Sequence, residues 1–483
     1  MSYDILLLLI VLVPVLLSTL LPVIAKFSVT LRNSFALLLM LIPMFFLCSI
    51  LPEVLSGNIV KFVFQFPLGI NFILQADIFA TFTAIASVLV STIILIYSFE
   101  YIKHYENQNE YYFIVVLFLG SMMGIIFSAN LIFIYIFWEM TALASWRLIG
   151  FFREKEYIRR ANKAFLLTAI GALFMLTGFL IIAEASGSFD LDIIANAGIT
   201  GGLVDLAIVF ILIGIFTKSA TFPLHSWLAD AGIAPSPVTA LLHAAVLVKI
   251  GVYVYGRLFS FVIIPSDSLR TVILIVIAVS AFVSGGIAFV EKDIKRVIAF
   301  STISQIAFIF LGFVSGGKVA FAGAMLFILI HGIAKAGLFL CAGIIEHKVH
   351  TKDLNKMGGL LKYMPFTAIA FACCALSVMG IPPFAGFFSK FLVIIGSVMD
   401  GNVFTGFAFI ICAGFTVLYL VRLFTKIFLG EEKGEFVSLS KEKLLSPMVL
   451  SVIFLAVLSL GFGLFFGDIF AIANLAANQM ISI

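Results

Sequence analysis

The sequence predicts an all-α, polytopic membrane protein. Of its 483 residues, 63% are hydrophobic and only 11% are charged, whereas roughly 25% of the residues of a soluble protein carry charge. Apolar runs of 18 residues or more recur from one end of the chain to the other. Each is long enough to cross a bilayer as a helix. The composition therefore excludes an ordinary soluble globular protein.

Prolines, glycines and charged clusters divide the chain into about fourteen predicted spans. We expect them at residues 4–24, 30–50, 77–99, 111–129, 131–152, 161–184, 202–231, 235–257, 270–290, 293–314, 319–345, 363–397, 403–429 and 447–467. The seventh and twelfth spans are too long for one straight crossing and contain internal prolines, so each predicts a broken helix.

The N-terminal segment MSYDILLLLIVLVPVLLSTLLPVIAK has no basic region and no small-residue cleavage site. We therefore expect a retained first helix rather than a signal peptide. All five cysteines lie in apolar segments without a CxxC pair, which indicates core residues rather than an iron–sulfur site or a disulfide framework. They are Cys48, Cys341, Cys373, Cys374 and Cys412. We expect neither a cofactor nor a bound metal in this chain.

Basic residues are distributed unevenly between the predicted loops. Loops after even-numbered spans hold only Lys61, Arg257, Arg270 and Lys318, whereas loops after odd-numbered spans hold all the other loop lysines and arginines, Arg32 among them. Because short basic loops stay in the cytoplasm, the odd-numbered loops are predicted to be cytoplasmic. Both termini are then expected on the extracytoplasmic side of the cell membrane.

Several ionisable residues fall inside predicted spans, where a lysine costs roughly 2.5–3.5 kcal/mol and is a functional hypothesis by default. Static pairing with carboxylates is the alternative, but the lysines outnumber the carboxylates. Because burial disfavours the charged form of an amine, a buried lysine can exchange its proton. The residues are Glu139, Arg147, Lys218, Lys249, Lys335, Lys390 and Arg422.

Two of these lysines accompany predicted breaks. Pro223 cannot donate a hydrogen bond to the carbonyl of Ser219, so the seventh span is expected to open one residue after Lys218. Unpaired backbone at membrane depth is tolerated only beside protein or water, which predicts a hydrated break. In the twelfth span, the prolines at 382–383 precede Lys390 by about seven residues. Two broken helices in the two halves of a chain indicate an inverted-repeat transporter.

Other polar residues connect the breaks. His331 and Lys335 are four residues apart and share a helix face, and histidine suits a proton relay because its ordinary pKa lies near neutrality. Lys249 and His243, six residues apart on the eighth span, are expected to point to different sides. Lys249 is the stronger relay candidate of the two.

Glu139 is the only carboxylate in the middle of a predicted span. Paired with Lys218, the Glu139 carboxylate would stabilise the protonated form of that lysine. Separating the two would promote proton release from Lys218, so the pair could act as a switch. Arg147 stays protonated, so it either holds a carboxylate or extends to the cytoplasmic interface. We expect the second. Arg422 presents the same alternatives.

Five separated segments resemble, in this order, the antiporter-like subunits shared by respiratory complex I, Mrp-type sodium/proton antiporters and energy-converting membrane-bound hydrogenases. They are FWEMTALASWRLIGF, TKSATFPLHSWLADAGIAPSPVTALLHAAVLVKIGVY, EKDIKRVIAFSTISQIAF, HGIAKAGLFL and GIPPFAGFFSK. The resemblance implies fourteen helices, two inverted five-helix repeats and a hydrated polar axis. Residues 1–110 would hold helices 1–3, residues 111–260 the first repeat (helices 4–8), residues 270–429 the second (helices 9–13), and residues 430–483 a loop with helix 14.

Carried over by motif, the resemblance implies a proton relay. Its members would be Glu139, Lys218, Lys249, which joins the halves, His331, Lys335, and Lys390 at the outlet. Lys295 matches a position that belongs to the path in some members, and His225 and His243 are further candidates. Members usually have an apolar residue where Arg147 stands. One subclass has glutamate where Lys390 stands, so the lysine argues against that subclass.

Three functions remain open at this point. The first is an ion-translocating subunit of a redox-driven complex related to membrane-bound hydrogenase or complex I, with hydrophilic partners that carry Fe–S or NiFe centres. The second is a subunit of an Mrp-type Na+/H+ antiporter without redox chemistry, and the third is a scaffold. We expect the first, with small membrane subunits and other antiporter-like subunits as partners. Protons, with Na+ as a further candidate, would be transported, and neither a redox site nor a nucleic-acid partner is expected.

Overall fold

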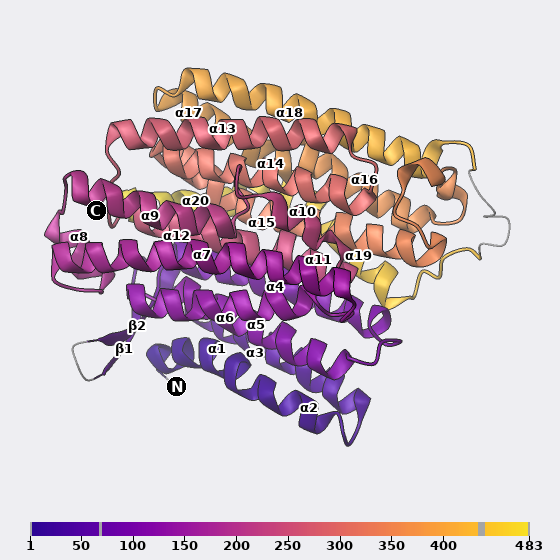
Figure 1. The fold of residues 1–483 in the computed structure, drawn as a ribbon, viewed down its shortest axis with the longest axis horizontal. Helices are drawn as coiled ribbons and strands as arrows, with labels where there is room; N and C mark the ends of the chain where they lie inside the picture. Colours follow the sequence, from indigo (N-terminus) through magenta and orange to yellow (C-terminus); the bar gives the residue numbers. More distant parts are fainter. Residues whose placement is uncertain (1, 67–69, 433–439, 482–483) are drawn as a thin grey trace.

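The computed structural model describes residues 2–66, 70–432 and 440–481, and most of them are helical. Figure 1 shows the long helices lying roughly parallel, with the N-terminal helices at one edge of the molecule and α18 (Val403–Phe424) at the other. Among the described residues, twelve helices are long and apolar enough to cross a membrane. The predicted all-α class is confirmed, and the number of spans stays a prediction.

The first part of the chain contains a small hairpin as well as helices. Its elements are α1 (Tyr3–Leu17), α2 (Leu21–Ile24), α3 (Val29–Leu55), β1 (Val60–Gln65), β2 (Asn71–Ala76) and α4 (Ile78–Tyr101). The two strands pair antiparallel, with Val60 opposite Ala76. We did not predict this hairpin, because six-residue strands between long apolar runs give little periodic signal.

The region of the first predicted repeat includes the expected break. Its elements are α5 (Gln108–Phe127), α6 (Leu131–Ile149), α7 (Lys155–Ser186), α8 (Leu191–Ala197), α9 (Gly202–Lys218), α10 (Ser226–Asp230), α11 (Ser236–Ala240), a π-helical turn (Leu241–Ala245) and α12 (Leu247–Phe259). The seventh predicted span ends its first helix at Lys218, as Pro223 led us to expect. The eighth is irregular as well, which we did not predict.

The region of the second predicted repeat also contains a divided span. Its elements, with those of the C-terminal part, are α13 (Asp267–Val290), α14 (Ile294–Ser315), α15 (Lys318–Val349), α16 (Pro365–Met379), α17 (Ala385–Met399), α18, α19 (Pro447–Leu464) and α20 (Phe466–Ile481). The twelfth predicted span is interrupted between α16 and α17 at Gly380, whose φ of +80° is a left-handed conformation that suits glycine. Helix α20 is additional to the one helix expected after residue 430.

Helix α15 occupies the centre of the molecule. Its apolar window is entirely buried, and it contacts α4, α11, the π-helical turn, α14, α16, α17, α19 and α20. It therefore touches elements of both predicted repeats. At one end of the bundle, which we call the hairpin end, the β-hairpin and α8 lie close to the two ends of the chain (Figure 1). These are the segments predicted to be extracytoplasmic, and their side of the membrane stays a prediction.

Candidate functional site

The C-terminal end of α9 places Lys218 in the protein interior. The side chain is fully buried, and its Nζ donates to the carbonyl of Trp138 on α6 at 3.1 Å while lying 5.3 Å from the centre of the Trp138 ring. Glu139 follows Trp138, and its charge interacts with that of Lys218. Within the described part of the chain, no ion pair within 4 Å joins them. One oxygen of Glu139 is buried without a hydrogen-bond partner there.

The irregular backbone before α12 directs Lys249 toward α15. Helical hydrogen bonding is interrupted at Val246, and the Lys249 Nζ donates to the carbonyl of Ala244 beside this interruption. The same Nζ lies against Gly332 of α15, where a Cβ atom would collide with it. His243 also faces α15, with its ring 4.6 Å from that of Phe339.

The expectation that His243 and Lys249 point to different sides is therefore wrong. It assumed a regular helix, whereas the π-helical turn and the interruption at Val246 change the rotation between the two residues.

His331 is surrounded by the buried charges of the candidate relay. It is 1% exposed, and neither ring nitrogen has a hydrogen-bond partner among the described residues. Lys249, Lys335, Lys390 and His243 all lie within electrostatic reach of it. A neutral imidazole has one nitrogen that donates and one that accepts, so a proton can enter on one side of this ring and leave from the other.

Lys335 belongs to a hydroxyl network that the sequence analysis did not assign. Its Nζ donates to the Ser301 hydroxyl and, at 3.3 Å, to the carbonyl of Ile298. Ser301 shares a hydrogen bond of 2.7 Å with the hydroxyl of Tyr419 on α18. Gln305 Nε2 donates to Thr416 at 3.2 Å and to Tyr419 at 3.4 Å. The run STISQ inside an apolar span was the available signal, but the partners on α18 gave none.

Lys390 reaches back across the break between α16 and α17. Its Nζ donates to the carbonyl of Val378 at 2.7 Å, one of the last carbonyls of α16. The rings of Phe308 and Phe327 lie 4.7 and 5.8 Å from the same nitrogen. A cation at a helix C-terminus interacts favourably with the helix dipole. The break thus provides an acceptor for Lys390 without a carboxylate.

Buried lysines and a histidine therefore form a row on α9, α12, α15 and α17, and Glu139 of α6 interacts with the first of them, Lys218. A sequence model of the NADH:quinone oxidoreductase/Mrp antiporter transmembrane family matches residues 128–416, more than half of the chain, and this range holds the whole row. The chain belongs to this family. The resemblance predicted from the five sequence segments is confirmed.

Relatives of this antiporter-like chain include Na+/H+ antiporter subunits. The chain is 33% identical over 487 aligned residues to Na(+)/H(+) antiporter subunit A1 of Staphylococcus haemolyticus, covering 95% of this chain and 60% of the relative. Subunit A1 of Staphylococcus aureus is 32% identical over 95% of this chain and 61% of its own length. The chain thus spans about 60% of the length of these relatives.

Two solved structures share the fold. A chain of the Mrp complex from Dietzia sp. superposes with a TM-score of 0.91 at 22% identity, covering 100% of this chain and 98% of that one. A chain of the membrane-bound sulfane sulfur reductase, an archaeal respiratory membrane complex, gives a TM-score of 0.89 at 22% identity, with 98% and 97% covered. A chain of an Mrp complex and a chain of a respiratory membrane complex therefore share this fold.

Of the three additional relay candidates of this antiporter-like subunit, His243 lies beside the row, whereas Lys295 and His225 lie apart from it. Lys295 pairs with Glu346 at 2.6 Å and donates to the carbonyl of Ala234 at 3.2 Å. Both line a cavity of about 310 Å³ that also includes His347 and Lys352. His225 lies in the break after α9 beside Phe222, with 5.2 Å between the rings. Glu346 is a partner that the sequence analysis did not identify.

Three arginines differ from the sequence expectation. Arg147 does not extend freely to the interface; it forms a two-point ion pair with Glu110 of α5, which Arg153 joins at 2.7 Å. Arg32, expected in a loop, is buried in α3. Arg257, also expected in a loop, is buried in the last turn of α12. The carboxylate partners, Glu110 of Arg147 and Asp77 of Arg257, are distant in sequence, so local spacing could not reveal them.

Arg422 donates through both terminal nitrogens to the carbonyl of Glu291 at 3.0 Å. It therefore holds the end of α13 rather than a carboxylate. Among the described residues, no group of three or more histidine, cysteine, aspartate or glutamate side chains is arranged to hold a metal ion.

Proposed function

We propose that this chain is a proton-translocating subunit of an Mrp-type Na+/H+ antiporter complex. One observation carries the proton part of this proposal. Lys218, Lys249, Lys335 and Lys390 are all buried, and each Nζ donates to a neutral carbonyl or hydroxyl oxygen. None of the four forms an ion pair with a carboxylate within 4 Å in the described part of the chain.

A static scaffold would not be built in this way. A buried charge that only holds helices together needs a paired counter-charge, because its desolvation penalty is several kcal/mol. A lysine that bonds only to neutral oxygens can instead be held in either protonation state. This argues for proton carriers and against the scaffold function.

The relay runs from Lys218 to Lys390 through α15. Glu139 is close enough to influence the charge on Lys218. Lys249 and His331 join the two halves, because the Lys249 ammonium can pass its proton to one ring nitrogen of His331. The resulting imidazolium releases a proton from its other nitrogen toward Lys335 or Lys390. The first transfer leaves a neutral amine on Lys249, the second leaves a neutral imidazole on His331, and each creates one new cation, so charge and protons balance.

The antiporter assignment rests on sequence similarity. The relative at 33% identity, matched over 95% of this chain, is a Na+/H+ antiporter subunit A1. A redox-driven complex, which we expected from the sequence, is the second candidate, because the chain also shares its fold with a chain of the sulfane sulfur reductase. At 22% identity that match supports the fold alone, so the antiporter takes precedence. Further small membrane subunits are the partners proposed here.

The relay is tested by Lys218→Arg in the assembled complex. Arginine keeps the charge but does not release a proton, so Na+-dependent proton movement in membrane vesicles should fall at least about 100-fold, the lower range for a lost acid–base group. Lys362→Arg, at an exposed lysine, is the matched control and should transport normally. Normal transport by Lys218→Arg at an equal amount of complex would contradict the relay.

The type of complex is tested separately. The tagged chain is purified from native membranes in mild detergent, and the co-purifying proteins and metals are identified by mass spectrometry and elemental analysis. Small hydrophobic subunits without stoichiometric iron or nickel would support the antiporter. Hydrophilic subunits with iron, or with iron and nickel, would replace it with the redox-driven complex and leave the relay proposal intact.

A further inference from the structure

The ion pair between Lys295 and Glu346 lies at the end of the molecule opposite the hairpin end, where α4 and α15 both finish. Lys295 is in the first turn of α14, and Glu346 is near the end of α15. Both residues line the cavity of about 310 Å³ described above. The Lys295 side chain is 1% exposed and that of Glu346 is 23% exposed. The carboxylate can therefore be reached from the cavity, while the lysine is enclosed by the protein.

Oxygen atoms from three segments gather at the Lys295 ammonium. Its Nζ lies 2.6 Å from Oε2 of Glu346 and donates to the carbonyl of Ala234 at 3.2 Å. The Ser236 hydroxyl donates to the same Oε2 at 3.5 Å. Carboxylate, carbonyl and hydroxyl oxygens are also the ligands that hard metal cations prefer. A Na+ ion in the place of the ammonium would therefore meet a suitable set of ligands, which water in the cavity would complete.

The ammonium and Na+ would exclude one another at this position. Each carries one positive charge, and a buried charge without its own counter-charge costs several kcal/mol. Lys295 stays beside the site because it is attached to α14, so Na+ can bind there only if the ammonium gives up a proton. The Nζ–H bond breaks, the electron pair stays on the nitrogen, and the proton passes to water in the cavity. One Na+ enters and one proton leaves, so the charge of the site is unchanged.

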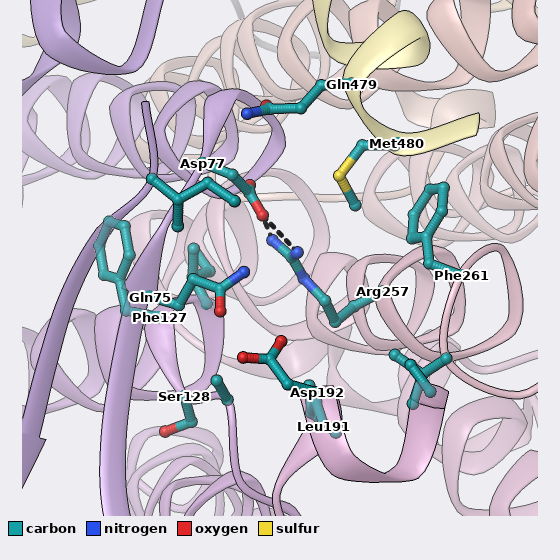
Figure 2. A pocket seen from close by; sticks show the side chains of 15 residues that line it. Gln75, Asp77, Phe127, Ser128, Leu191, Asp192, Arg257, Phe261, Gln479 and Met480 are labelled. Atoms are coloured by element: carbon teal, nitrogen blue, oxygen red, sulfur yellow. Dashed lines mark hydrogen bonds and ion pairs between the residues drawn. The ribbon is translucent and has the colours of Figure 1, made fainter. Parts of the chain in front are cut away.

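An ion pair at the hairpin end shows why a lysine is needed. Arg257 and Asp77 lie in the wall of a cavity of about 110 Å³ (Figure 2), with Nη1–Oδ2 and Nη2–Oδ1 distances of 2.5 and 2.9 Å. Arginine does not release its proton in proteins. Na+ therefore cannot replace Arg257 by the same exchange, although this pair is also buried and borders a cavity.

We propose that Glu346, Ala234 and Ser236 form a Na+ site for which the Lys295 ammonium competes. The site rests on the proposed antiporter function and gives that function a place where one Na+ exchanges for one proton. When Na+ is bound, Lys295 is a neutral amine. When Na+ leaves, the amine takes up a proton and pairs with Glu346 again, so the carboxylate has a cation in both states.

The test measures Na+ binding to the purified complex rather than transport. The melting temperature is followed as NaCl replaces N-methylglucamine chloride at constant ionic strength, because a ligand of the folded state stabilises it. If each Na+ displaces one proton, the apparent Kd of the parent should fall about tenfold per pH unit between pH 8 and pH 9. Lys295→Met should bind Na+ about tenfold more tightly or better at pH 8, and this pH dependence should disappear. Parent-like Na+ binding by an assembled Lys295→Met complex would overturn the site.

Other titratable groups border the same cavity and have to be separated from Lys295. They are Tyr101, Tyr105, Tyr157, His347, His350 and Lys352. The chosen pH range lies above the ordinary titration of histidine, near 6.5, and below that of tyrosine, near 10. Lys352→Met is the matched control, because Lys352 pairs with Oε1 of Glu346 at 3.6 Å but is 27% exposed. This variant should keep the pH dependence of Na+ binding; its loss would assign the released proton to Lys352 and overturn the role of Lys295.

Ser236→Ala keeps the proposal testable if Lys295→Met does not assemble. It removes a ligand without changing a charge, so the apparent Kd for Na+ should rise severalfold with the pH dependence of the parent. Ser451→Ala is its control, because that buried hydroxyl donates only to Pro447 of its own helix, and Na+ binding should not change. Unchanged Na+ binding by an assembled Ser236→Ala complex would overturn the site.

Lys218→Arg distinguishes this proposal from the relay. It should block transport but leave Na+ binding and its pH dependence as in the parent, because Lys218 is not part of the Na+ site. If Lys218→Arg blocks transport while Lys295→Met binds Na+ like the parent, only the Na+ site is wrong.

Discussion

Gly332→Ala tests the position of Lys249 without changing any ionisable group. A Cβ atom at residue 332 would overlap the Lys249 Nζ, whereas the carbonyl of Ala244 and Cγ2 of Val90 would be 3.3 and 3.5 Å from it. Ordinary contacts between heavy atoms lie near 3.5–4.0 Å, so the amine has to move by about 1 Å. It would then leave both the Ala244 carbonyl and its place beside His331.

The fold should tolerate this substitution. The colliding atom is the end of a flexible side chain, so the backbones of α12 and α15 need not shift. Replacing an interior helical glycine with alanine also favours the helix by roughly 1 kcal/mol. Transport should nevertheless fall by about 100-fold, because a displacement of 1 Å in a reacting group has an effect of that size. A variant that is well assembled but inactive is the expected result.

The assay compares Na+-dependent proton movement in vesicles, per amount of complex, with the melting temperature of the purified complex. Gly286→Ala on α13 and Gly414→Ala on α18 are the controls, because a Cβ at either position meets nothing within 4 Å. Both should transport like the parent. If Gly332→Ala also transports within about twofold of the parent, the reasoning about Lys249 and His331 is refuted.

Three further predictions concern other parts of the site. Tyr419→Phe removes the partner of Ser301 at 2.7 Å and should reduce transport roughly tenfold with a stability loss of about 1 kcal/mol; parent-level transport would show that the network on α18 is only structural. Glu346→Gln leaves the buried Lys295 without its carboxylate, so thermal stability of the complex should fall, by about 1–3 kcal/mol. Lys295→Met in that background should restore stability, and normal transport by the double variant would exclude Lys295 from the relay. Glu291 has a lowered pKa: burial alone would raise it, but Arg296 at 2.9 Å and two backbone N–H groups outweigh this effect. The ionised Glu291 carboxylate therefore stabilises the folded state. This stabilisation is fully present above the unfolded pKa of about 4.3 and is lost as pH falls through the lower folded pKa. The melting temperatures of the parent and of Glu291→Gln should therefore converge between pH 7 and pH 3; a difference that grows on acidification would contradict the assignment.

Some features were predictable because they depend on local physics. A bilayer requires long apolar helices, so the apolar spans could be predicted from composition. A proline cannot complete the hydrogen-bond ladder of a helix, so the end of α9 at Lys218 could be predicted from Pro223. The same reasoning predicted a break of the twelfth span at the prolines at 382–383, and the structure interrupts this span at Gly380, shortly before them. The identity of the buried lysines was likewise visible, because each is unusual in its own apolar segment.

Other features depended on contacts between distant segments. Arg147 was expected to extend to the interface, but Glu110, 37 residues away, provides a carboxylate. Lys249 and His243 were assigned to different sides because the helix was assumed to be regular. The π-helical turn packs against α15 and has no sequence signal that we could use. The side of the membrane on which the termini lie, and the relay itself, stay predictions.

The sequence by itself determined that this chain is a membrane-embedded, antiporter-like subunit with lysines at membrane depth and two broken helices, because apolar length, proline chemistry and buried charge act within one segment. Only the tertiary structure decided what each charge contacts. Lys335 donates a hydrogen bond to Ser301, which in turn shares one with Tyr419, 118 residues away from Ser301. Arg257 pairs with Asp77, which is 180 residues away in the sequence. Such partners are set by how helices pack against one another, since a buried polar group is stabilised by whichever acceptor the neighbouring helix places beside it.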